Sequence, residues 1–498
     1  MAIKISFLVI FFAIMIVVGA YCRKHAKDVN NFLLGGRNVG PWLSAFSYGT
    51  SYFSAVIFVG YAGQFGWKYG ISATWIGIGN AIIGSLLAWL ILANRTRLMT
   101  EHLQSATMPD FFGKRFNSKF VTLLASIVCF VFLIPYTASL YNGLSRIFMM
   151  AFGIDYAWCV IGMALITGVY VVLGGYMATA INDLIQGIIM LGGIIAIIWT
   201  VLSGNGGFSA AVASLAQISD DGGQFATAFG PDVISLLGVV ILTSLGTWGL
   251  PQMVSKFYAI KDKKAIKKGT IVSTIFAIVI AGGCYFLGGF GRLYGDVVAR
   301  VDGKIIFDSI MPAMLAKLPD VLIGTVAVLV LSASMSTLSA LVLTSSSTIT
   351  LDFIEPLRKK KFSEKGKILA MRLFILMFIA VSGVIAIVQA KSTVTFIAQL
   401  MGISWGALAG ACLAPFLLSL YWKKVTKAAV VVNIIFAPCL MVINMLFGKY
   451  FPVLLRSPIN CGVVAMLAGF VIVPLVSLFT KKPDGVDKIF ECCGKETA

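Results

Sequence analysis

The chain has 498 residues, of which 59% are hydrophobic and only 12% are charged, and its mean hydropathy is +0.95. Soluble domains carry about 25% charged residues, so this composition excludes a soluble globular protein. The formal net charge of +19 is typical of a membrane protein whose basic loops face anionic lipid heads, rather than of a nucleic-acid binder.

Thirteen segments are apolar and long enough to cross a bilayer, since a span needs about 20 residues. In chain order they cover approximately residues 5–22, 41–66, 71–93, 119–142, 156–174, 181–203, 233–253, 269–290, 318–351, 369–390, 394–421, 427–448 and 458–480. The first lacks an A-x-A cleavage site, so we interpret it as a helix rather than a signal peptide. The sequence therefore predicts an all-α polytopic membrane protein with about 13 transmembrane helices.

The basic residues predict how the chain crosses the membrane. If the N-terminus lies outside, 29 of the 39 Lys and Arg residues fall at cytoplasmic connections and in the tail. The positive-inside rule then places the N-terminus outside and the C-terminus in the cytoplasm, as an odd number of crossings requires. We expect a multi-pass protein of the plasma (bacterial cytoplasmic) membrane, with the lipid bilayer as a partner and no nucleic acid.

Two predicted helices that are five crossings apart are interrupted near their middle. The segment 41–66 contains the run GTS at 49–51, and the segment 233–253 contains GTWGLP at 246–251. Irregular backbone at membrane depth is tolerated only where it lines a cavity or is buried in protein. Interrupted helices at corresponding positions indicate a transporter site between inverted repeats. Close packing around glycine is the alternative.

The two breaks predict how the chain is divided. Residues 1–30 form a peripheral helix and the first cytoplasmic loop, and residues 31–204 form a first repeat of helices 2–6. Residues 205–421 form a second repeat of helices 7–11, and residues 422–498 form helices 12 and 13 with a cytoplasmic tail.

A single acidic residue, Asp183, stands about one turn inside the cytoplasmic end of the segment 181–203. Intramembrane carboxylates usually face an interior cavity and mark ion pathways. An Asp favoured by the dipole at a helix start is the alternative. Position alone leaves both interpretations open.

The segment 318–351 is rich in hydroxyl groups, because eleven of the nineteen residues in 332–350 are Ser or Thr. Ala333, Ser336 and Thr337 stand at i, i+3 and i+4, so they share one face of a helix. One carbonyl and two hydroxyls on that face are hard, uncharged oxygens, which suit a small hard cation that must bind and then leave. Packing against neighbouring helices is the alternative.

Three motifs resemble the sodium:solute symporter family in their order and spacing. They are NFLLGGRNVGP at 31–41, GGYMATAINDLIQG at 174–187 and SMSTLS at 334–339, and the resemblance covers nearly the whole chain. It implies a LeuT-type fold of five-plus-five inverted repeats. It also implies a secondary active transporter in which sodium, the coupling ion, and a small solute enter together, with no cofactor and no enzymatic activity.

The family's sodium site implies five ligands at the matching positions of this sequence. They are the carbonyls of Thr50, Phe53 and Ala333 and the hydroxyls of Ser336 and Thr337. This set includes the helix face described above. Asp183 matches an acidic residue that the family places on the sodium exit path.

A second sodium site in this family would need two hydroxyls after the Ser336–Thr337 pair. Ser339 supplies one, but the next residue is Ala340. We therefore expect one sodium ion per cycle, with Ser339 and Asp183 as candidates for the sodium pathway.

The substrate pocket is predicted between the two breaks, near Ser54, Tyr136, Thr243, Thr247 and Trp248. In the proline-transporter branch that the chain resembles most, an Asp replaces Tyr52, and an aromatic pair replaces Thr243 and Thr247. We therefore expect a pocket with less aromatic area and more hydroxyls. We also expect no basic residue in the deep core, so a substrate carboxylate would rely on backbone N–H groups at a broken helix. A small carboxylate or amino acid is the first candidate, and a sugar-like polyol is the second.

Other classes of protein fit less well. The run GISWG at 402–406 matches a hydrolase pattern, but no strand precedes it and no His lies nearby. A transporter-like membrane sensor remains an alternative, although the tail after Lys481 is only about 18 residues long and short for a kinase. A channel would need a continuous lined pore, and an ATP-driven pump would need a P-loop.

Overall fold

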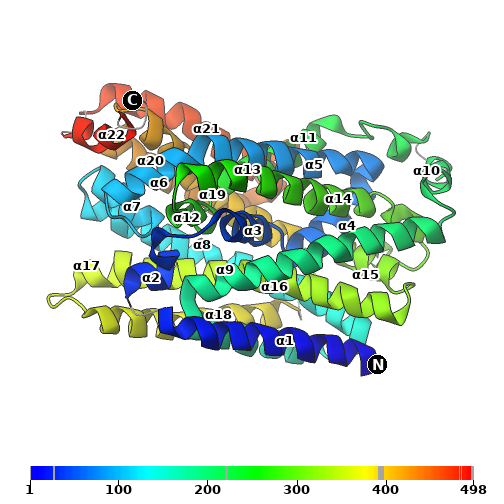
Figure 1. The fold of residues 1–498 in the computed structure, drawn as a ribbon. Coiled ribbons are helices and arrows are strands. Elements are labelled where there is room, and N and C mark those ends of the chain that lie inside the picture. The colour runs from blue at the N-terminus through cyan, green and yellow to red at the C-terminus, as the bar shows by residue number, and fades with distance from the viewer. Residues whose placement is uncertain are drawn as a thin grey trace.

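The computed structural model describes residues 2–25, 28–218, 222–390, 397–481, 483 and 485–494. They form an elongated bundle of helices that run along a common axis, with the N-terminus at one end and the C-terminus at the other (Figure 1). Ends on opposite sides are what an odd number of crossings produces.

The α-helices of the first half are α1 (Ala2–Cys22), α2 (Val29–Leu34), α3 (Pro41–Tyr52), α4 (Ala62–Tyr69), α5 (Thr74–Gly79), α6 (Asn94–His102), α7 (Met108–Arg115), α8 (Lys119–Phe152), α9 (Tyr156–Gly204) and α10 (Phe208–Ala216). Those of the second half are α11 (Val233–Leu245), α12 (Pro251–Tyr258), α13 (Lys263–Ala277), α14 (Gly283–Gly288), α15 (Ile310–Leu315), α16 (Asp320–Ser347), α17 (Glu355–Leu357), α18 (Glu364–Ala390), α19 (Ile397–Tyr421), α20 (Lys427–Phe447), α21 (Pro458–Phe479) and α22 (Val486–Gly494).

Shorter elements join or extend these helices. The π-helical segments are η3 (Val56–Tyr61), η5 (Asn80–Leu87), η6 (Trp89–Ala93), η9 (Ile278–Gly282) and η12 (Thr348–Ile354). The 3-10 turns are η1 (Arg23–His25), η2 (Gly35–Arg37), η4 (Gly70–Ala73), η7 (Gln224–Ala226), η8 (Gly246–Trp248), η10 (Gly291–Tyr294), η11 (Phe307–Ser309), η13 (Gly448–Tyr450) and η14 (Val453–Leu455). Strands β1 (Arg300–Val301) and β2 (Lys304–Ile305) pair antiparallel in the connection between α14 and α15.

Ten helical runs among the described residues are long and apolar enough to cross a membrane, or eleven if the bent pair α11–α12 counts as one span. The predicted number of 13 is not confirmed by this count. However, the runs Val56–His102 and Tyr156–Gly204 are 47 and 49 residues long, about twice the length of a span. In each run the chain reverses its direction while the helical assignment continues, so two crossings are counted as one run.

The reversals occur at glycines with left-handed backbone angles, which cost other residues more. Gly175 in α9 has φ 56°. Tyr170, before it, donates a hydrogen bond to the Met335 carbonyl, and Asp183, after it, contacts the adjacent Ser336. A straight helix would separate residues 170 and 183 by about 20 Å, so the two halves of α9 fold back on one another.

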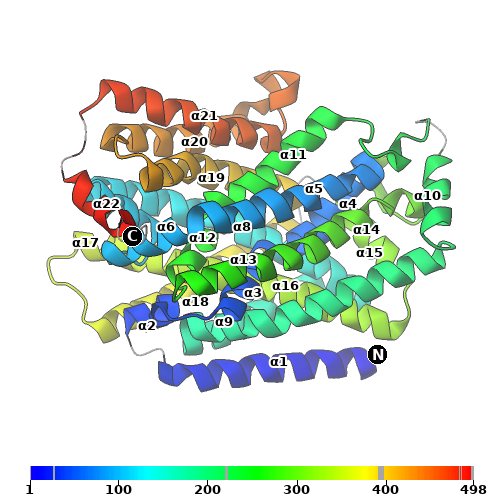
Figure 2. The same cartoon turned by 45° about the horizontal axis from the view of Figure 1, so that its top comes forward.

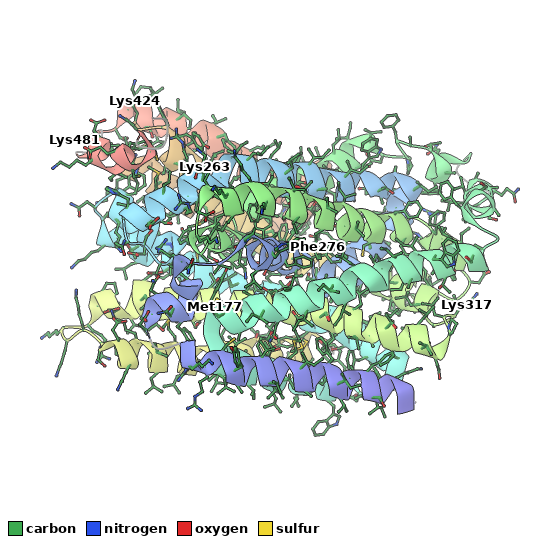
Figure 3. The ribbon with its side chains drawn as sticks, viewed as in Figure 1. Met177, Lys263, Phe276, Lys317, Lys424 and Lys481 are labelled. Atoms are coloured by element: carbon green, nitrogen blue, oxygen red, sulfur yellow. The ribbon has the colours of Figure 1, made fainter. Side chains whose placement is uncertain are left out.

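Basic side chains mark the two ends of the bundle. Lys263, Lys424 and Lys481 lie at the end that carries α22, whereas Lys317 lies at the opposite end (Figure 3). The first three belong to connections predicted to be cytoplasmic, and Lys317 belongs to one predicted to be outside. The structure therefore separates the ends as the charge pattern requires, and the direction of insertion stays a prediction.

Helix α16 occupies the centre of the bundle. It packs against α1, α3, α8, α9 and α18, and the most apolar window of its span is entirely buried. By contrast, α1 lies at one edge of the molecule and α20 and α21 lie at the other (Figure 2). The division into two repeats with peripheral helices stays a prediction.

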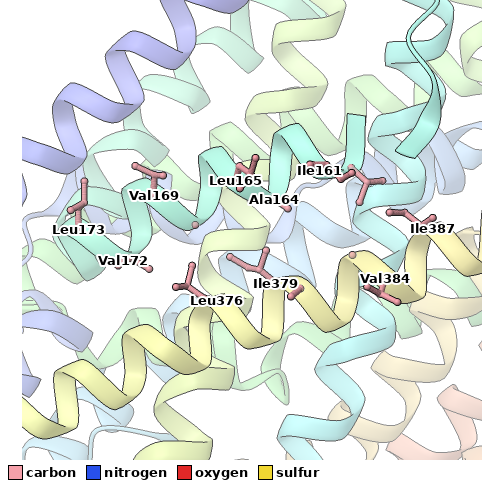
Figure 4. A pocket seen from close by; sticks show the side chains of 14 residues that line it. Ile161, Ala164, Leu165, Val169, Val172, Leu173, Leu376, Ile379, Val384 and Ile387 are labelled. Carbon is pink, nitrogen blue, oxygen red and sulfur yellow. The ribbon is translucent and has the colours of Figure 1, made fainter. Parts of the chain in front are cut away.

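A groove of about 550 Å³ lies between the first half of α9 and α18 (Figure 4). Its walls are aliphatic side chains and two glycines, and two of these side chains, Leu165 and Val384, are 60% or more exposed. A surface of this kind suits lipid chains and offers a polar solute no hydrogen-bonding side chain.

Candidate functional site

The first broken helix ends in the middle of the bundle. Helix α3 stops at Tyr52, and Phe53 has an extended backbone with φ −95° and ψ 108° before η3 begins. The last carbonyls of a helix lack intrahelical N–H partners. These carbonyls carry the negative end of the helix dipole, which favours a cation.

The second broken helix presents the amino end of its second half, α12, at its break. The axes of Val233–Trp248 and Pro251–Tyr258 differ by 42°, and Leu250 between them is extended. Pro251 begins α12, where its missing N–H costs nothing. The first turn of α12 therefore presents backbone donors and the positive end of a dipole, which favour an anion.

Helix α16 meets the first break through the predicted hydroxyls. The Thr337 Oγ1 atom lies 3.4 Å and 3.2 Å from the carbonyl oxygens of Thr50 and Ser51, and 3.1 Å from that of Ala333. Ser336 Oγ lies 2.8 Å from Thr50 Oγ1. All these residues are buried, so carbonyl and hydroxyl oxygens from two helices converge away from water.

The other two sodium-related candidates behave differently. Phe53 is buried at the same break, and its role as a carbonyl ligand stays a prediction. Ser339 donates its hydroxyl to the Ser336 carbonyl of its own helix, at 2.8 Å. Ser339 therefore packs beside the candidate cation site, and its role in a sodium pathway also stays a prediction.

Asp183 lies next to this cluster and is fully buried within α9. Ser336 donates a hydrogen bond to its Oδ1 atom and Ser47 donates one to its Oδ2 atom, both at 2.6 Å. A carboxylate that merely favours a helix start would lie in the first turn. Asp183 is instead held by hydroxyls from α3 and α16, which supports the ion-pathway interpretation.

The expectation of no basic residue in the deep core is wrong. Lys256 in α12 has a side chain that is only 3% exposed, and its Nζ atom lies 3.7 Å from Asp183 Oδ2. It also donates a 2.8 Å hydrogen bond to Ser47. Hydropathy ends the predicted helix at residue 253 and assigns Lys256 to a loop, whereas α12 continues to Tyr258. Pairing with Asp183 allows the ammonium group to be buried.

A second cluster, mostly aromatic, surrounds the break from the other side. Trp405 of α19 lies between Tyr52 and Tyr136, with ring centroids 6.2 Å and 5.9 Å away. The Tyr136 hydroxyl faces Ser54. The Ser54 hydroxyl and the Trp405 indole nitrogen are both buried beside the Tyr136 hydroxyl, but neither makes a well-formed hydrogen bond among the described residues. Buried polar groups normally have partners, so these two atoms mark a place for a polar ligand.

The three candidates from the second break have partners on η5. The Thr243 hydroxyl donates to Asn80, the Thr247 hydroxyl contacts the Gly84 carbonyl, and the Trp248 indole donates to the Ile83 carbonyl. Thr243 connects to the aromatic cluster through its backbone, since its carbonyl accepts a hydrogen bond from the Tyr52 hydroxyl at 3.0 Å. Roles for the Thr247 and Trp248 side chains in solute binding stay predictions.

Comparisons with known proteins agree with this geometry. Residues 32–436 match the model of the sodium:solute symporter family. The chain belongs to that family. As a sodium:solute symporter it couples sodium to the symport of a small organic solute, and it does so as a membrane protein with a LeuT-type fold.

Two curated relatives are similar along almost their whole length. The osmoregulated proline transporter OpuE of Bacillus subtilis is 30% identical over 95% of this chain and 94% of its own. Sodium/proline symporter 2 of Staphylococcus saprophyticus is 29% identical over 96% of this chain and 93% of its own. Among solved structures, a Na⁺-coupled sialic acid symporter superposes with a TM-score of 0.79 at 18% identity, over 96% of this chain and 98% of its own. Mhp1, a nucleobase-cation-symport-1 family transporter, superposes with a TM-score of 0.53 at 14% identity, over 93% and 98%.

Sequence reasoning missed the residues of this symporter that act across long distances in the chain. Trp405 lies within the GISWG run that resembles a hydrolase motif, and it packs against Tyr52 and Tyr136 beside the first break. Lys256 had one usable signal, because it follows Gln252 and Pro251 at helical spacing and would continue the same helix.

Proposed function

We propose that this symporter carries one sodium ion together with a small amino acid or small carboxylate into a bacterial cell. Sodium is held by the carbonyls of Thr50, Phe53 and Ala333 and by the hydroxyls of Ser336 and Thr337. The observation that carries this proposal is the approach of the Thr337 hydroxyl to within 3.4 Å of the carbonyls that end α3. Uncharged oxygens bind a small cation weakly enough to release it.

The driving force of one sodium ion is sufficient for concentrative uptake. A tenfold sodium gradient contributes about 1.4 kcal/mol, and a membrane potential of about 100 mV contributes about 2.3 kcal/mol. Together these support accumulation of a neutral solute by several hundred fold. The cycle is electrogenic because one net charge enters with each solute.

The solute site lies between the two breaks, beside Ser54, Tyr136 and Thr243. The amino end of α12 supports a carboxylate, since it offers backbone donors and a positive dipole. Trp405 and Tyr52 supply flat apolar surfaces for the rest of a small solute. The curated relatives are named for proline, so proline is the first amino acid to test.

A sugar-like polyol is a second candidate, supported by the hydroxyl-bearing side of the second break. Asn80 accepts hydrogen bonds from Thr243 and Ser244 through its Oδ1 atom. Its buried Nδ2 atom has no partner among the described residues. A polyol hydroxyl would accept from this amide nitrogen without needing a charged group.

Transport proceeds by alternating access of two inverted repeats, residues 31–204 and 205–421, around the shared site. The N-terminus lies outside and the C-terminus in the cytoplasm, as the distribution of basic residues supports. Sodium at the end of α3 fixes the first break, so the solute pocket is ordered before the solute arrives.

The proposal is tested in two stages. Purified protein is first screened by thermal shift with sodium and a panel of proline, other small amino acids, small monocarboxylates and polyols, because ligands of the folded state raise its unfolding temperature. The radiolabelled hit is then added outside proteoliposomes, and its uptake is measured with an inward sodium gradient or with choline in place of sodium. We expect uptake only with sodium, increased by an inside-negative potential. Uptake that persists unchanged in choline at constant pH contradicts sodium coupling.

A further inference from the structure

The carboxylate of Asp183 separates two different environments. Its Oδ1 atom accepts a hydrogen bond from Ser336, on the side of the candidate sodium site. Its Oδ2 atom accepts from Ser47 and faces the ammonium group of Lys256, 3.7 Å away. One carboxylate therefore lies between the place where sodium binds and a cation that belongs to the protein.

The contact with Ser336 orients a sodium ligand. A hydroxyl has one proton and two lone pairs, and a carboxylate is an acceptor only. When Ser336 donates its hydrogen bond to Asp183, its lone pairs are left for a cation beside Thr50 and Thr337. Asp183 is thus a positioning residue for the sodium site, and its own charge is balanced from the other side.

Lys256 is placed where sodium would leave. It lines a cavity of about 30 Å³, together with Tyr176 of α9, Leu34 of α2 and Met108 of α7, which is room for about two water molecules. Helices α2 and α7 lie at the same end of the bundle as the C-terminus (Figure 1), the predicted cytoplasmic end. The Lys256 Nζ atom also lies 5.2 Å above the Tyr176 ring, which favours a cation there.

We propose that Lys256 is a resident counter-cation that keeps Asp183 from capturing the transported sodium ion. This inference rests on the sodium site proposed above. While Lys256 neutralises Asp183, the incoming ion meets only neutral oxygens and Asp183 orients Ser336 without binding sodium itself. After the ion moves toward the cytoplasm, the carboxylate in its path is already paired, so the ion is released rather than trapped.

The charge balance predicts effects of opposite sign. Lys256→Met leaves Asp183 as an unpaired negative charge beside the site, so the sodium dissociation constant should fall at least tenfold, which is about 1.4 kcal/mol. Asp183→Asn leaves an unpaired ammonium group that repels sodium, so the constant should rise at least tenfold. The double variant removes both charges and keeps an amide oxygen for Ser336. Its constant should lie within about threefold of wild type.

These constants are measured on purified protein by calorimetric sodium titration and by the sodium-dependent shift of the unfolding temperature. Release of radioactive sodium from proteoliposomes gives a second readout, and Lys256→Met should slow it because the ion is held by Asp183. Lys256→Arg keeps the positive charge and should restore both quantities toward wild type. Lys424→Met removes an exposed lysine at the same end of the molecule (Figure 3) and controls for net charge.

Each outcome has a defined meaning. Single variants that shift sodium affinity in the same direction, or a double variant that binds sodium no better than Asp183→Asn, would overturn the counter-cation role. A buried unpaired charge is strongly destabilising, so the single variants can fail to fold. The double variant then decides, because it must fold and bind sodium near the wild-type constant. Wild-type protein that binds no sodium would instead reject the proposed sodium site.

Discussion

The central span of this symporter carries two hydroxyl-rich stretches that differ in what lies opposite them. Residues 332–339 contain five Ser or Thr among eight residues and residues 344–350 contain six among seven, and nearly all are buried. In the first stretch, Ser336 and Thr337 make hydrogen bonds to α3 and α9. In the second, Ser347 donates to a carbonyl of its own helix, 3.0 Å away.

The difference teaches that composition alone does not make a cation site. The first stretch faces the end of α3, where carbonyls lack intrahelical partners. The second stretch continues into η12, which packs against α8 and α18. In the second stretch Ser346 and Ser347 bond to carbonyls of their own helix, whereas the buried hydroxyls of Ser345, Thr348 and Thr350 have no hydrogen-bond partner among the described residues.

The largest effect is expected at Thr337, which contacts carbonyls of both α3 and α16. Thr337→Ala removes one of about five oxygen ligands, so the sodium concentration for half-maximal uptake should rise at least tenfold. Thr337→Ser keeps the hydroxyl and should recover most of the affinity. Sodium titrations of uptake in proteoliposomes measure both variants. An unchanged sodium requirement in Thr337→Ala would make the two stretches equivalent and would favour packing for both.

A somewhat smaller effect is expected for the coupling between sodium binding and solute binding. Sodium at the end of α3 orders the break that also borders the solute pocket, so filling one site lowers the cost of filling the other. We expect sodium to tighten solute binding about tenfold, and the solute to tighten sodium binding by the same factor. Calorimetric titrations of each ligand with and without the other provide the test. Independent affinities would separate the pocket from the break.

The candidate sodium site could be proposed from the sequence because its signals are local, and it stays a prediction. Ala333, Ser336 and Thr337 lie within about one helical turn, and the small, polar residues 49–51 predicted a break that the structure places just after them, at Phe53. The resemblance to the sodium:solute symporter family then predicted that these two segments contribute ligands to one site. The structure brings the Thr337 hydroxyl to the predicted Thr50 carbonyl, which no spacing rule within one segment could have established.

Residues whose role depends on tertiary packing could not be predicted. Trp199 is 76% exposed and Trp405 is fully buried, yet both are aromatic residues within apolar spans. Lys256 resembles the other basic residues near a helix end, and only the distant Asp183 explains its burial. The number of crossings is obscured for a related reason, since a positive φ at Gly175 reverses the chain without ending the helix.

A modest effect is expected at Ser339, the last residue of the first stretch. Its hydroxyl donates to the Ser336 carbonyl rather than to another helix, so Ser339→Ala should change the sodium requirement by about threefold at most. The sodium dependence of uptake should have a Hill coefficient near one in both proteins. A coefficient near two that falls to one in Ser339→Ala would demonstrate a second sodium ion.

The smallest effect is expected in the second stretch, at Ser346 and Ser347. Each hydroxyl donates to a carbonyl one turn earlier in α16, at 3.1 Å and 3.0 Å. Such carbonyls already accept a backbone hydrogen bond, so losing the hydroxyl leaves no unpaired group. Alanine at either position should lower the free energy of unfolding by only about 0.6 kcal/mol, the usual value of a side-chain hydrogen bond in a membrane bundle.

The sodium requirement should then change less than twofold in both variants, because neither hydroxyl faces a broken helix. Uptake titrations alongside Thr337→Ala give the direct comparison within one helix. A rise of tenfold in Ser346→Ala or Ser347→Ala would show that the ion also contacts the second stretch on its way to the cytoplasm. Hydroxyls as far as Ser347 would then bind the ion, and the end of α3 would not be the feature that distinguishes ion-binding hydroxyls from packing hydroxyls.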